Sequence, residues 1–530
     1  MRRLLPSVAV AIVLVACVSD DSGSPDGGGS DATLDAPSSA DGGGDTGVDA
    51  GPPIGDSVIT RANHDTRDAL YVQSTFGPQA ISTIKLDSTF DGTVSGNVYA
   101  QVLFFQNGPN GKPVIIAATS NDQLTAMDAD TGAVVWQKTF GTPAGASGAG
   151  CGNISPLGIT GTPAIDPATR TIFFSAVTGT NATITDHVIH AVSLDDGTEK
   201  PGFPVNASTA SYQGTKFSPP VQNQRGAILY VNGVIYVPYG GHAGDCGSYH
   251  GWVVGVPFPA GSPVTAYAAS IAANTRAAGI WAPGGPSSDG TDVFVTTGNT
   301  FGATTWVGQE AVLRFTSGPT FSNQTADYWA PHNFLALDNG DVDIGGTGSM
   351  VVDVPGATPS KLIVALGKDG NAYLIDRTNL GGIGASTATD GIANLNVASG
   401  EIINTPASVT TGGATYVYLR PLSGSGVKCA TGSGDLVAVK ITPASPPTMS
   451  VVWCATSGTQ GSPIVTTTDG SANPIVWVVG TKLLGFDGVS GKPVYTGTDT
   501  VANVRKFTSP IAAHGRIYIG ADDKVYAFKQ

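Results

Sequence analysis

Two short stretches of the chain share one alternation of apolar and polar positions. Residues 124–136 read LTAMDADTGAVVW and residues 483–495 read LLGFDGVSGKPVY. In each, an apolar strand precedes an Asp that can cap the turn, and a Gly four positions later can adopt the positive φ of a bulged loop. The second strand ends in an aromatic residue. Each stretch therefore predicts a β-hairpin, which must pack against copies of itself because an isolated hairpin is unstable in water.

The chain also contains eight segments typical of inner strands. Four of them place Thr-Pro or Ser-Pro before small apolar residues, which lets a strand approach an axis without bulky side chains. Many are followed by a second strand with alternating β-branched and aromatic residues, as expected for a half-buried strand. The eight segments are 97–105, 160–168, 224–237, 281–295, 346–354, 404–411, 461–468 and 508–520.

Eight sheet-like units at uneven spacing favour a β-propeller over a sandwich. The last unit, which ends at Gln530, has sequence for only three strands, whereas residues 79–87 (QAISTIKLD) form an orphan strand before the first unit. Pairing the two would complete the final blade. We therefore predict an all-β fold, a single propeller over residues 57–530 with eight blades and a ring closed by this N-terminal strand. Seven blades is the alternative if 281–295 or 346–354 is not an inner strand.

Composition excludes a largely helical protein. The chain has 72 Gly among 530 residues and a charged fraction of 12%, about twice and about half the usual shares. Surface helices need Lys, Glu, Arg and Ala on their wet faces, and only three Glu occur, at positions 199, 310 and 401. Most of the acidic residues are Asp, which favours turns.

The N-terminus has the features of an export signal. Arg2 and Arg3 precede an apolar stretch, residues 8–15, which is too short to span a bilayer but long enough for a signal-peptide core. The stretch runs into LVAC, ending at Cys17, and this resembles the lipobox of bacterial lipoproteins. The resemblance implies cleavage before Cys17 and a diacylglycerol on its thiol. We therefore expect residues 1–17 to be a lipoprotein signal peptide; a plain cleaved signal is the alternative.

Residues 18–56 predict a disordered tether. They contain nine Asp and no Lys or Arg among Gly, Ser, Ala and Pro, so they cannot bury a core. The formal net charge of −14 argues against nucleic acid as a partner. We expect a monomer held to a membrane by its lipid: an exported bacterial lipoprotein of the outer membrane, on the periplasmic or cell-surface side.

Longer segments resemble a known superfamily. LTAMDADTGAVVW is similar to the repeat of the pyrroloquinoline-quinone-type propellers, which include the quinoprotein alcohol dehydrogenases and the assembly lipoprotein BamB. CGNISPLGITGTPAIDPATRTIFF, NQRGAILYVNGVIYVPYGGHAGDCGSYHGWVVGV and KLIVALGKDGNAYLIDRTNLGG resemble a bacterial and fungal group of quinone-like propeller proteins. The resemblance covers nearly all of residues 60–530 and implies the propeller fold. It implies no single activity, because the superfamily contains both enzymes and cofactor-free scaffolds.

The four cysteines after Cys17 fit an oxidising compartment, since their number is even. Cys429 and Cys454 flank a hairpin-like stretch and can meet across neighbouring strands. Cys151 and Cys246 remain, both in long loops. We expect these two disulfides, and the absence of any CxxC or Cys/His spacing argues against structural zinc.

Three groups of residues could carry chemistry. The first is the loop GHAGDCGSYHGW, in which His242, Asp245 and His250 could bind a metal. Their spacing is irregular, however, and a disulfide at Cys246 would already order the loop. The favoured interpretation is structural, with His250 packed between blades.

The second group is LDNGDVDIGGTG, with Asp338, Asp341 and Asp343 ahead of the fifth inner strand. Closely spaced Asp with Gly can hold a hard cation such as calcium, and the resemblance implies an Asp near the axis as a base. The favoured interpretation is a set of turns capped by Asp side chains.

The third group pairs Trp281 with Asn299, in IWAPGGP and TTGNTFG. A Trp facing the channel could stack on a flat ring, and the Asn could add an amide. The favoured interpretation is again structural, with the Trp wedged between blades.

Two function classes remain. The favoured one is a binding or assembly module that presents the propeller to a protein, peptide or glycan outside the cytoplasm. The alternative is a quinoprotein dehydrogenase that oxidises an alcohol or sugar with pyrroloquinoline quinone (PQQ) and calcium. The resemblance implies, for such enzymes, a cofactor held between a Trp and a disulfide of adjacent cysteines, with calcium bound by Glu, Asn and Asp. No two cysteines are adjacent here, and only Glu310 and Glu401 could supply the Glu. PQQ and calcium are therefore not favoured.

Overall fold

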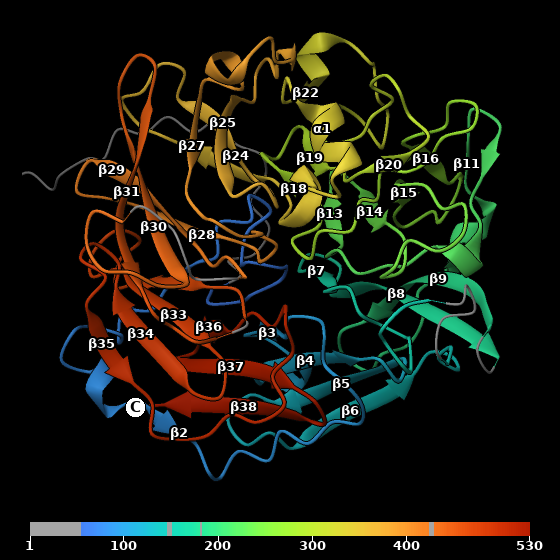
Figure 1. Ribbon diagram of the computed structural model, residues 1–530. Coiled ribbons are helices and arrows are strands. Elements are labelled where there is room, and N and C mark those ends of the chain that lie inside the picture. The colour runs from blue at the N-terminus through green and yellow to red at the C-terminus, as the bar shows by residue number, and fades with distance from the viewer. Residues whose placement is uncertain (1–54, 146–150, 181–182, 423–428, 460) are drawn as a thin grey trace, which may run out of the picture. The chain divides into compact units, whose positions relative to one another are not determined.

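The computed structural model describes residues 55–145, 151–180, 183–422, 429–459 and 461–530. They lie within one compact unit, Gly51–Gln530. Eight β-sheets follow one another around a ring (Figure 1). The predicted signal peptide, Cys17 and nearly all of the predicted tether lie outside the described residues. Within these ranges, none of the helices has the length and apolar character that a membrane crossing requires.

Each sheet is one blade, and its strands run outward from the ring centre in chain order. Blade 1 consists of β3 (Leu103–Phe105), β4 (Val114–Thr119), β5 (Gln123–Asp128) and β6 (Val134–Thr139). Blade 2 consists of β7 (Ala164–Asp166), β8 (Thr171–Thr180), β9 (Thr183–Ser193) and β10 (Val205–Asn206). Blade 3 consists of β13 (Leu229–Val231), β14 (Val234–Tyr239), β15 (Trp252–Pro257) and β16 (Thr265–Ala268). Blade 4 consists of β18 (Ser287–Ser288), β19 (Val293–Thr296), β21 (Val312–Phe315) and β22 (Tyr328–Ala330), with β26 (Gly382–Ile383) on its outer edge.

The second half of the ring is built in the same way. Blade 5 consists of β23 (Met350–Asp353), β24 (Lys361–Leu366), β25 (Asn371–Asp376) and β27 (Ala393–Asn396). Blade 6 consists of β28 (Ala407–Thr411), β29 (Ala414–Leu419), β30 (Leu436–Thr442) and β31 (Thr448–Ala455). Blade 7 consists of β32 (Ile464–Thr467), β33 (Ile475–Val479), β34 (Leu483–Asp487) and β35 (Pro493–Thr496), with β1 (Leu70–Val72) on its inner edge. Blade 8 consists of β36 (Ile511–Ala513), β37 (Arg516–Ala521), β38 (Lys524–Lys529) and β2 (Lys85–Leu86).

Smaller elements sit in the connections. Two small sheets pair β11 (Ser211–Tyr212) with β12 (Thr215–Lys216), and β17 (Arg276–Ala277) with β20 (Thr300–Phe301). The α-helix α1 (Phe334–Asn339) lies between blades 4 and 5. The predicted all-β fold with eight blades is confirmed, because β18 and β23, in the two doubtful segments, each begin a blade.

The predicted closure of the ring is also confirmed. Strand β2 pairs antiparallel with β38, so that Lys85 lies opposite Lys529 and Leu86 opposite Phe528. The closing strand is shorter than the predicted 79–87, because residues 81–83 form a 3₁₀ turn. The first and last parts of the chain therefore share one blade, and the ring has no open seam at this point.

In two blades, 1 and 7, the repeated hairpin also bonds to the neighbouring blade. In blade 1 the Asp128 carboxylate accepts hydrogen bonds from the backbone N–H groups of the turn, and Gly132 has a φ of 74°. The indole Nε1–H of Trp136 then donates to the Leu194 carbonyl of blade 2, at 2.9 Å. In blade 7 the Tyr495 hydroxyl likewise donates to the Ile84 carbonyl at the edge of blade 8, at 3.0 Å. The repeat is needed more than once because its aromatic residue fastens one blade to its neighbour.

Residues 58–69 line the inside of the ring, a placement that the sequence did not predict. We call this segment the plug. Its backbone bonds to the innermost strands of six blades, through the pairs Val58–Phe104, Ile59–Ile165, Asp65–Ser288, Thr66–Val351, Asp68–Ser408 and Ala69–Val465, at 2.7 to 3.1 Å. Arg67 adds bonds to Pro286 O and Ile228 O. The plug thus fills the centre of the ring with chain that precedes the first blade.

Candidate functional site

A cavity of about 280 Å³ opens where several innermost strands begin. Its walls come from the segments that enter blades 3, 4, 5, 6 and 8 and from the loops that follow β14, β19 and β24. We call it the axial cavity. Its lining carries charged residues from both signs and aromatic rings: Arg225, Asp245, Asp341, Asp343, Lys368, Glu401 and Lys506, with Tyr249, Trp281 and Phe507, and with Asn153, His242 and Asn299. Arg61 of the plug donates to Phe507 O at 3.2 Å, so the plug supports this wall.

The structure brings together six residues from the three groups that the sequence singled out. They are His242, Asp245, Trp281, Asn299, Asp341 and Asp343. Two singled-out residues do not line the cavity. His250 packs with its Nδ1 at 3.2 Å from Ala269 O, and Asp338 accepts a hydrogen bond of 2.9 Å from the Thr300 hydroxyl. These two hold the surrounding loops.

Lys368 organises the acidic side of the axial cavity. Its Nζ lies 2.6 Å from Asp343 Oδ2 and 2.9 Å from Asp341 Oδ1. The other carboxylate oxygen of Asp343 accepts a hydrogen bond of 2.7 Å from the Asn299 backbone N–H. Burial raises the pKa of Asp343, and the Lys368 ammonium opposes that rise. Burial alone would lower the pKa of Lys368, but the Asp343 carboxylate outweighs that effect and raises it. Both oxygens of Asp343 are therefore already engaged.

Glu310 lies beside this pair, out of reach of solvent. Its Oε2 accepts a hydrogen bond of 2.7 Å from the Ile344 N–H, and its Oε1 is buried with no hydrogen-bond partner among the described residues. Burial, and then the nearby Asp343 carboxylate, raise the pKa of Glu310 well above its ordinary value. Burial thus favours the protonated form of Glu310.

Cations also lie over the aromatic rings of the axial cavity. The Arg225 guanidinium lies 5.1 Å from the centroid of the Trp281 ring and 5.5 Å from that of Phe507. Lys368 Nζ lies 5.7 Å from the Trp281 ring, and Lys506 Nζ lies 5.6 Å from the Phe507 ring. Burial lowers the pKa of Arg225 to about 10, so it stays charged at neutral pH. Trp281 thus faces the cavity and is not simply wedged between blades.

The sequence interpretation missed the three cations. Arg225 lies in a segment, 224–237, that was interpreted as an inner strand and for its resemblance, and Lys368 lies in KLIVALGKDGNAYLIDR, which was used only for its resemblance. A signal was available for Lys368: it opens the tight turn between two strong strand patterns, and it follows the Asp-rich loop of the same blade. Nothing in the sequence alone brings Lys506 near either of them.

Both expected disulfides are present. Cys151 bonds to Cys246 and Cys429 bonds to Cys454. The first joins two loops at the edge of the axial cavity, since Asn153 and Asp245, close to its cysteines in sequence, line the cavity. This disulfide fixes the loop of His242 and Asp245 relative to blade 2.

PQQ and calcium fit this cavity unequally. A flat polyanion suits the ring of Trp281 and the cations Arg225 and Lys368. Calcium needs six to eight oxygen ligands, but the oxygens of Asp343 are occupied by Lys368 and Asn299. The described part of the chain contains no group of three or more His, Cys, Asp or Glu side chains that could hold a metal ion. The calcium half of the arrangement therefore does not fit.

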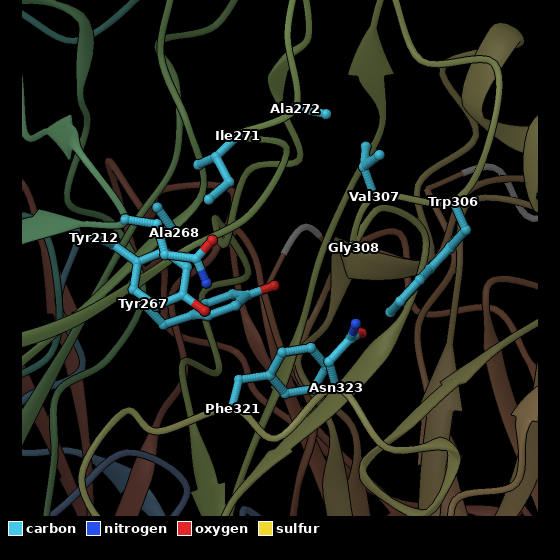
Figure 2. Close-up of a pocket in the computed structure, with 11 residues that line it drawn as sticks. Tyr212, Tyr267, Ala268, Ile271, Ala272, Trp306, Val307, Gly308, Phe321 and Asn323 are labelled. Atoms are coloured by element: carbon cyan, nitrogen blue, oxygen red, sulfur yellow. The ribbon is translucent and has the colours of Figure 1, made fainter.

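A second, larger cavity lies between blades 3 and 4, and we call it the lateral cleft. Its volume is about 410 Å³. Four aromatic residues, Tyr212, Tyr267, Trp306 and Phe321, form most of its wall, and the amides of Gln213 and Asn323 lie at its edge. Figure 2 shows Trp306 across the cleft from Tyr212 and Ile271, with Phe321 and Asn323 below. No Asp, Glu, Lys, Arg or His is among the described residues that line it.

The described residues thus define an eight-bladed β-propeller with a charged cavity where several innermost strands begin. The quinohemoprotein alcohol dehydrogenase from Comamonas testosteroni matches with a TM-score of 0.60 and 12% identity, over 89% of this chain and 80% of that one. The quinohemoprotein alcohol dehydrogenase ADHIIG from Pseudomonas putida HK5 matches with a TM-score of 0.59 and 11% identity, over the same shares.

A europium-containing methanol dehydrogenase matches with a TM-score of 0.54 and 12% identity, over 87% of this chain and 89% of that one. No family model matches the sequence, and no curated protein matches it either. At these identities the likeness shows the fold alone. The resemblance to quinoprotein-type propellers is confirmed to that extent.

Proposed function

We propose that this chain is an exported, lipid-anchored binding module whose axial cavity takes an acidic group of a protein, peptide or glycan. The observation that carries the proposal is Arg225. Within the described residues its Nε has no hydrogen-bond partner and no carboxylate forms an ion pair with it. A buried charge is costly unless it is paired. A carboxylate on the ligand would supply the missing partner.

The aromatic residues of the axial cavity favour a ligand that carries a ring next to this carboxylate. Trp281 and Phe507 both lie beneath the Arg225 guanidinium, and aromatic faces pack well on other rings and on apolar edges. Lys506 adds a second cation without an ion pair in the described residues, and burial lowers its pKa. By contrast, Asp341 and Asp343 are neutralised by Lys368. The cavity thus holds two cations without an ion pair in the described residues, Arg225 and Lys506, beside an acidic pair that Lys368 neutralises.

The test uses two probes that differ by one charge, N-acetylphenylalanine and its amide. We expect the purified protein to bind the acid at least about tenfold more tightly than the amide. Arg225→Met should remove this preference. Arg170→Met is the matched control, because Arg170 also lies over an aromatic ring, 5.6 Å from the centroid of Phe105, but is paired with Asp195. Equal binding of the two probes, or no binding of either, would contradict the proposal.

One observation favours the alternative function, a quinoprotein dehydrogenase: Trp281, Asn299 and Asp343 come together in one cavity, as the resemblance implies. The two functions are separated by titration with PQQ, with and without calcium, followed by Trp fluorescence and by dye-linked oxidation of alcohols and aldoses. We expect no calcium-dependent binding and no turnover. Stoichiometric, calcium-dependent binding with turnover would replace the binding module by the dehydrogenase.

The lipid anchor is supported by the LVAC motif at Cys17 and by the Asp-rich stretch that follows. We expect Cys17→Ala to move the protein from the membrane fraction of its host to the soluble or unprocessed fraction. Ser22→Ala, in the same N-terminal region, is the control and should stay with the membrane. A membrane pool unchanged by Cys17→Ala would refute the anchor.

A further inference from the structure

The lateral cleft has a rigid aromatic platform that no part of the proposed function uses. The Trp306 indole stacks on Tyr328, with ring centroids 4.0 Å apart and planes 19° from parallel. Its Nε1–H donates to Gln309 O at 2.9 Å. One face and the only polar atom of the indole are therefore occupied by the protein itself. The other face lines the cleft (Figure 2).

The loop that carries Trp306 is held from inside. The side chain of Gln309 is fully buried, and its Oε1 accepts from the Val307 N–H at 2.7 Å while its Nε2 donates to Thr305 O at 3.1 Å. One buried amide thus fixes both sides of Trp306. The platform is in place before any ligand arrives, which lowers the entropic cost of binding.

Three further aromatic rings form the wall opposite Trp306, and the space between suits a ring-shaped ligand. Tyr267 lies 5.3 Å from Tyr212 and 5.3 Å from Phe321, measured between ring centroids. These contacts fix the three rings opposite Trp306. The volume of about 410 Å³ falls in the usual range of small-ligand sites.

The polar groups of the cleft are amides, not charges. Gln213 and Asn323 are exposed at its edge, both in the left-handed backbone region with φ of 47° and 59°. An amide side chain donates and accepts hydrogen bonds, and so does each hydroxyl of a sugar. The lining residues include no ionised group at neutral pH, so nothing in the cleft would offset the desolvation of a charged ligand.

We propose that the lateral cleft binds a neutral oligosaccharide, with the apolar face of one sugar ring on the open face of Trp306 and its hydroxyls on Gln213 and Asn323. The C–H bonds of a sugar ring carry a weak positive charge, which suits the negative face of an indole. A proline-rich peptide, the other common occupant of aromatic grooves, is less suited. Such a peptide offers carbonyl acceptors, but the Trp306 N–H is already bonded to Gln309.

The test is calorimetric titration of the purified protein with cellotetraose, maltotetraose and tri-N-acetylchitotriose. We expect saturable binding of at least one of them. Trp306→Ala should weaken it by about tenfold or more, and Trp306→Phe by less, because a smaller aromatic face remains. Asn323→Leu should weaken it by about threefold or more without unfolding the protein, since the residue is exposed.

The matched control is Trp136→Ala. Trp136 is also half-buried and also donates its Nε1–H to a backbone carbonyl, at 2.9 Å, but it lies on β6 in blade 1. This variant, and Arg225→Met in the axial cavity, should bind the sugar as the wild type does, so the cleft is tested separately from the proposed function. No saturable binding of any of the three sugars would overturn the proposal, as would equal losses in Trp306→Ala and Trp136→Ala. Displacement of a bound sugar probe by a polyproline peptide with higher affinity would assign the cleft to peptides instead.

Discussion

The axial cavity and the lateral cleft are two cavities of similar size built from opposite materials. Seven of the residues that line the axial cavity are Asp, Glu, Lys or Arg, and two of them, Lys368 and Asp343, form a close pair. The lateral cleft is larger and has no charged lining residue in the described structure. The difference follows from their positions. The segments that enter the innermost strands converge and carry most of the charges, among them Arg225, Asp343 and Lys506, whereas the outer loops of blades 3 and 4 carry aromatic residues.

Electrostatic interactions dominate in the axial cavity, and aromatic contacts dominate in the lateral cleft. In the axial cavity, Lys368 is paired with Asp341 and Asp343, so removing one of these charges disturbs its partner. In the cleft, each aromatic ring contributes by contact alone, so removing one costs contact area. The predictions below use this contrast, beginning with the largest effect.

Removing the plug and β2 should prevent the ring from folding, and both cavities would be lost with it. Deleting residues 1–56 leaves the plug and β2, and we expect the cooperative thermal unfolding of the intact chain. Deleting residues through Asp91 also removes both elements, and with them the support of Arg61 for Phe507. We expect no cooperative transition for this form, measured by circular dichroism on heating. Equal melting temperatures for the two truncations would show that neither element holds the ring.

Removing a charge from the axial cavity should cost far more than adding one to the cleft. Asp343→Asn leaves the Lys368 ammonium with the exposed Asp341 as its only carboxylate partner in the described structure, and should lower the free energy of unfolding by about 3 kcal/mol. Asn323→Asp, the opposite exchange on an exposed residue of the cleft, should change it by about 0.5 kcal/mol or less. Urea unfolding measures both. Similar losses in the two variants would mean that the cavities do not differ in this respect.

The axial region should also make stability depend on pH. Because burial raises the pKa of Glu310, the folded state binds a proton there at pH values at which the unfolded chain has lost it, above about 4.3. Stability attributable to Glu310 therefore falls as pH rises from that value toward the folded pKa. Glu310→Gln should match the wild type near pH 4 and exceed it by about 1 kcal/mol or more at pH 8.

Urea midpoints at the two pH values measure this effect. The exposed Glu401→Gln serves as the control and should give little change at either pH. If Glu310→Gln were no more stable than the wild type at pH 8, the carboxyl would be ionised at no cost in the folded state. That outcome would remove the burial argument for this side of the axial cavity.

The smallest expected effect is that of salt, which should weaken ligand binding more in the axial cavity than in the lateral cleft. Raising the ionic strength from about 0.05 to 0.5 M shortens the screening length severalfold. We expect the affinity of the axial cavity for N-acetylphenylalanine to fall by about threefold over this range, and the affinity of the cleft for a neutral sugar to change by less than about half as much. Titration at both salt concentrations measures it. Equal sensitivity would indicate that charge plays no part in axial binding.

The sequence predicted the ring better than its centre. Strand alternation and turn residues are local, so all eight inner strands and the hairpin of Asp128 and Gly132 could be recognised directly. The closing strand was predicted because the last unit has sequence for only three strands and an unpaired strand precedes the first unit. The plug could not be recognised, because its residues have no strand alternation and bond through their backbones to partners up to about 400 residues later in the chain, such as Val465.

The candidate sites, too, could be predicted only where the signal is local in the sequence. From the sequence, Asp343 belonged to one candidate group and Trp281 with Asn299 to another, and structural roles were favoured for both groups. The sequence could not place Arg225 or Lys506 beside them, because the convergence of loops from five blades is a property of the closed ring. The lateral cleft was missed entirely, since Tyr212, Tyr267 and Trp306 read individually as ordinary strand or loop aromatics.

The plug has a consequence for the order in which the protein can fold. Its first residues are synthesised early, yet their backbone partners include Ser408 and Val465, and β2 pairs with Phe528 of β38. Contacts over such long sequence separations form slowly. The earliest part of this unit is therefore among the last to reach its final place, and the ring cannot be completed before β38 has been synthesised.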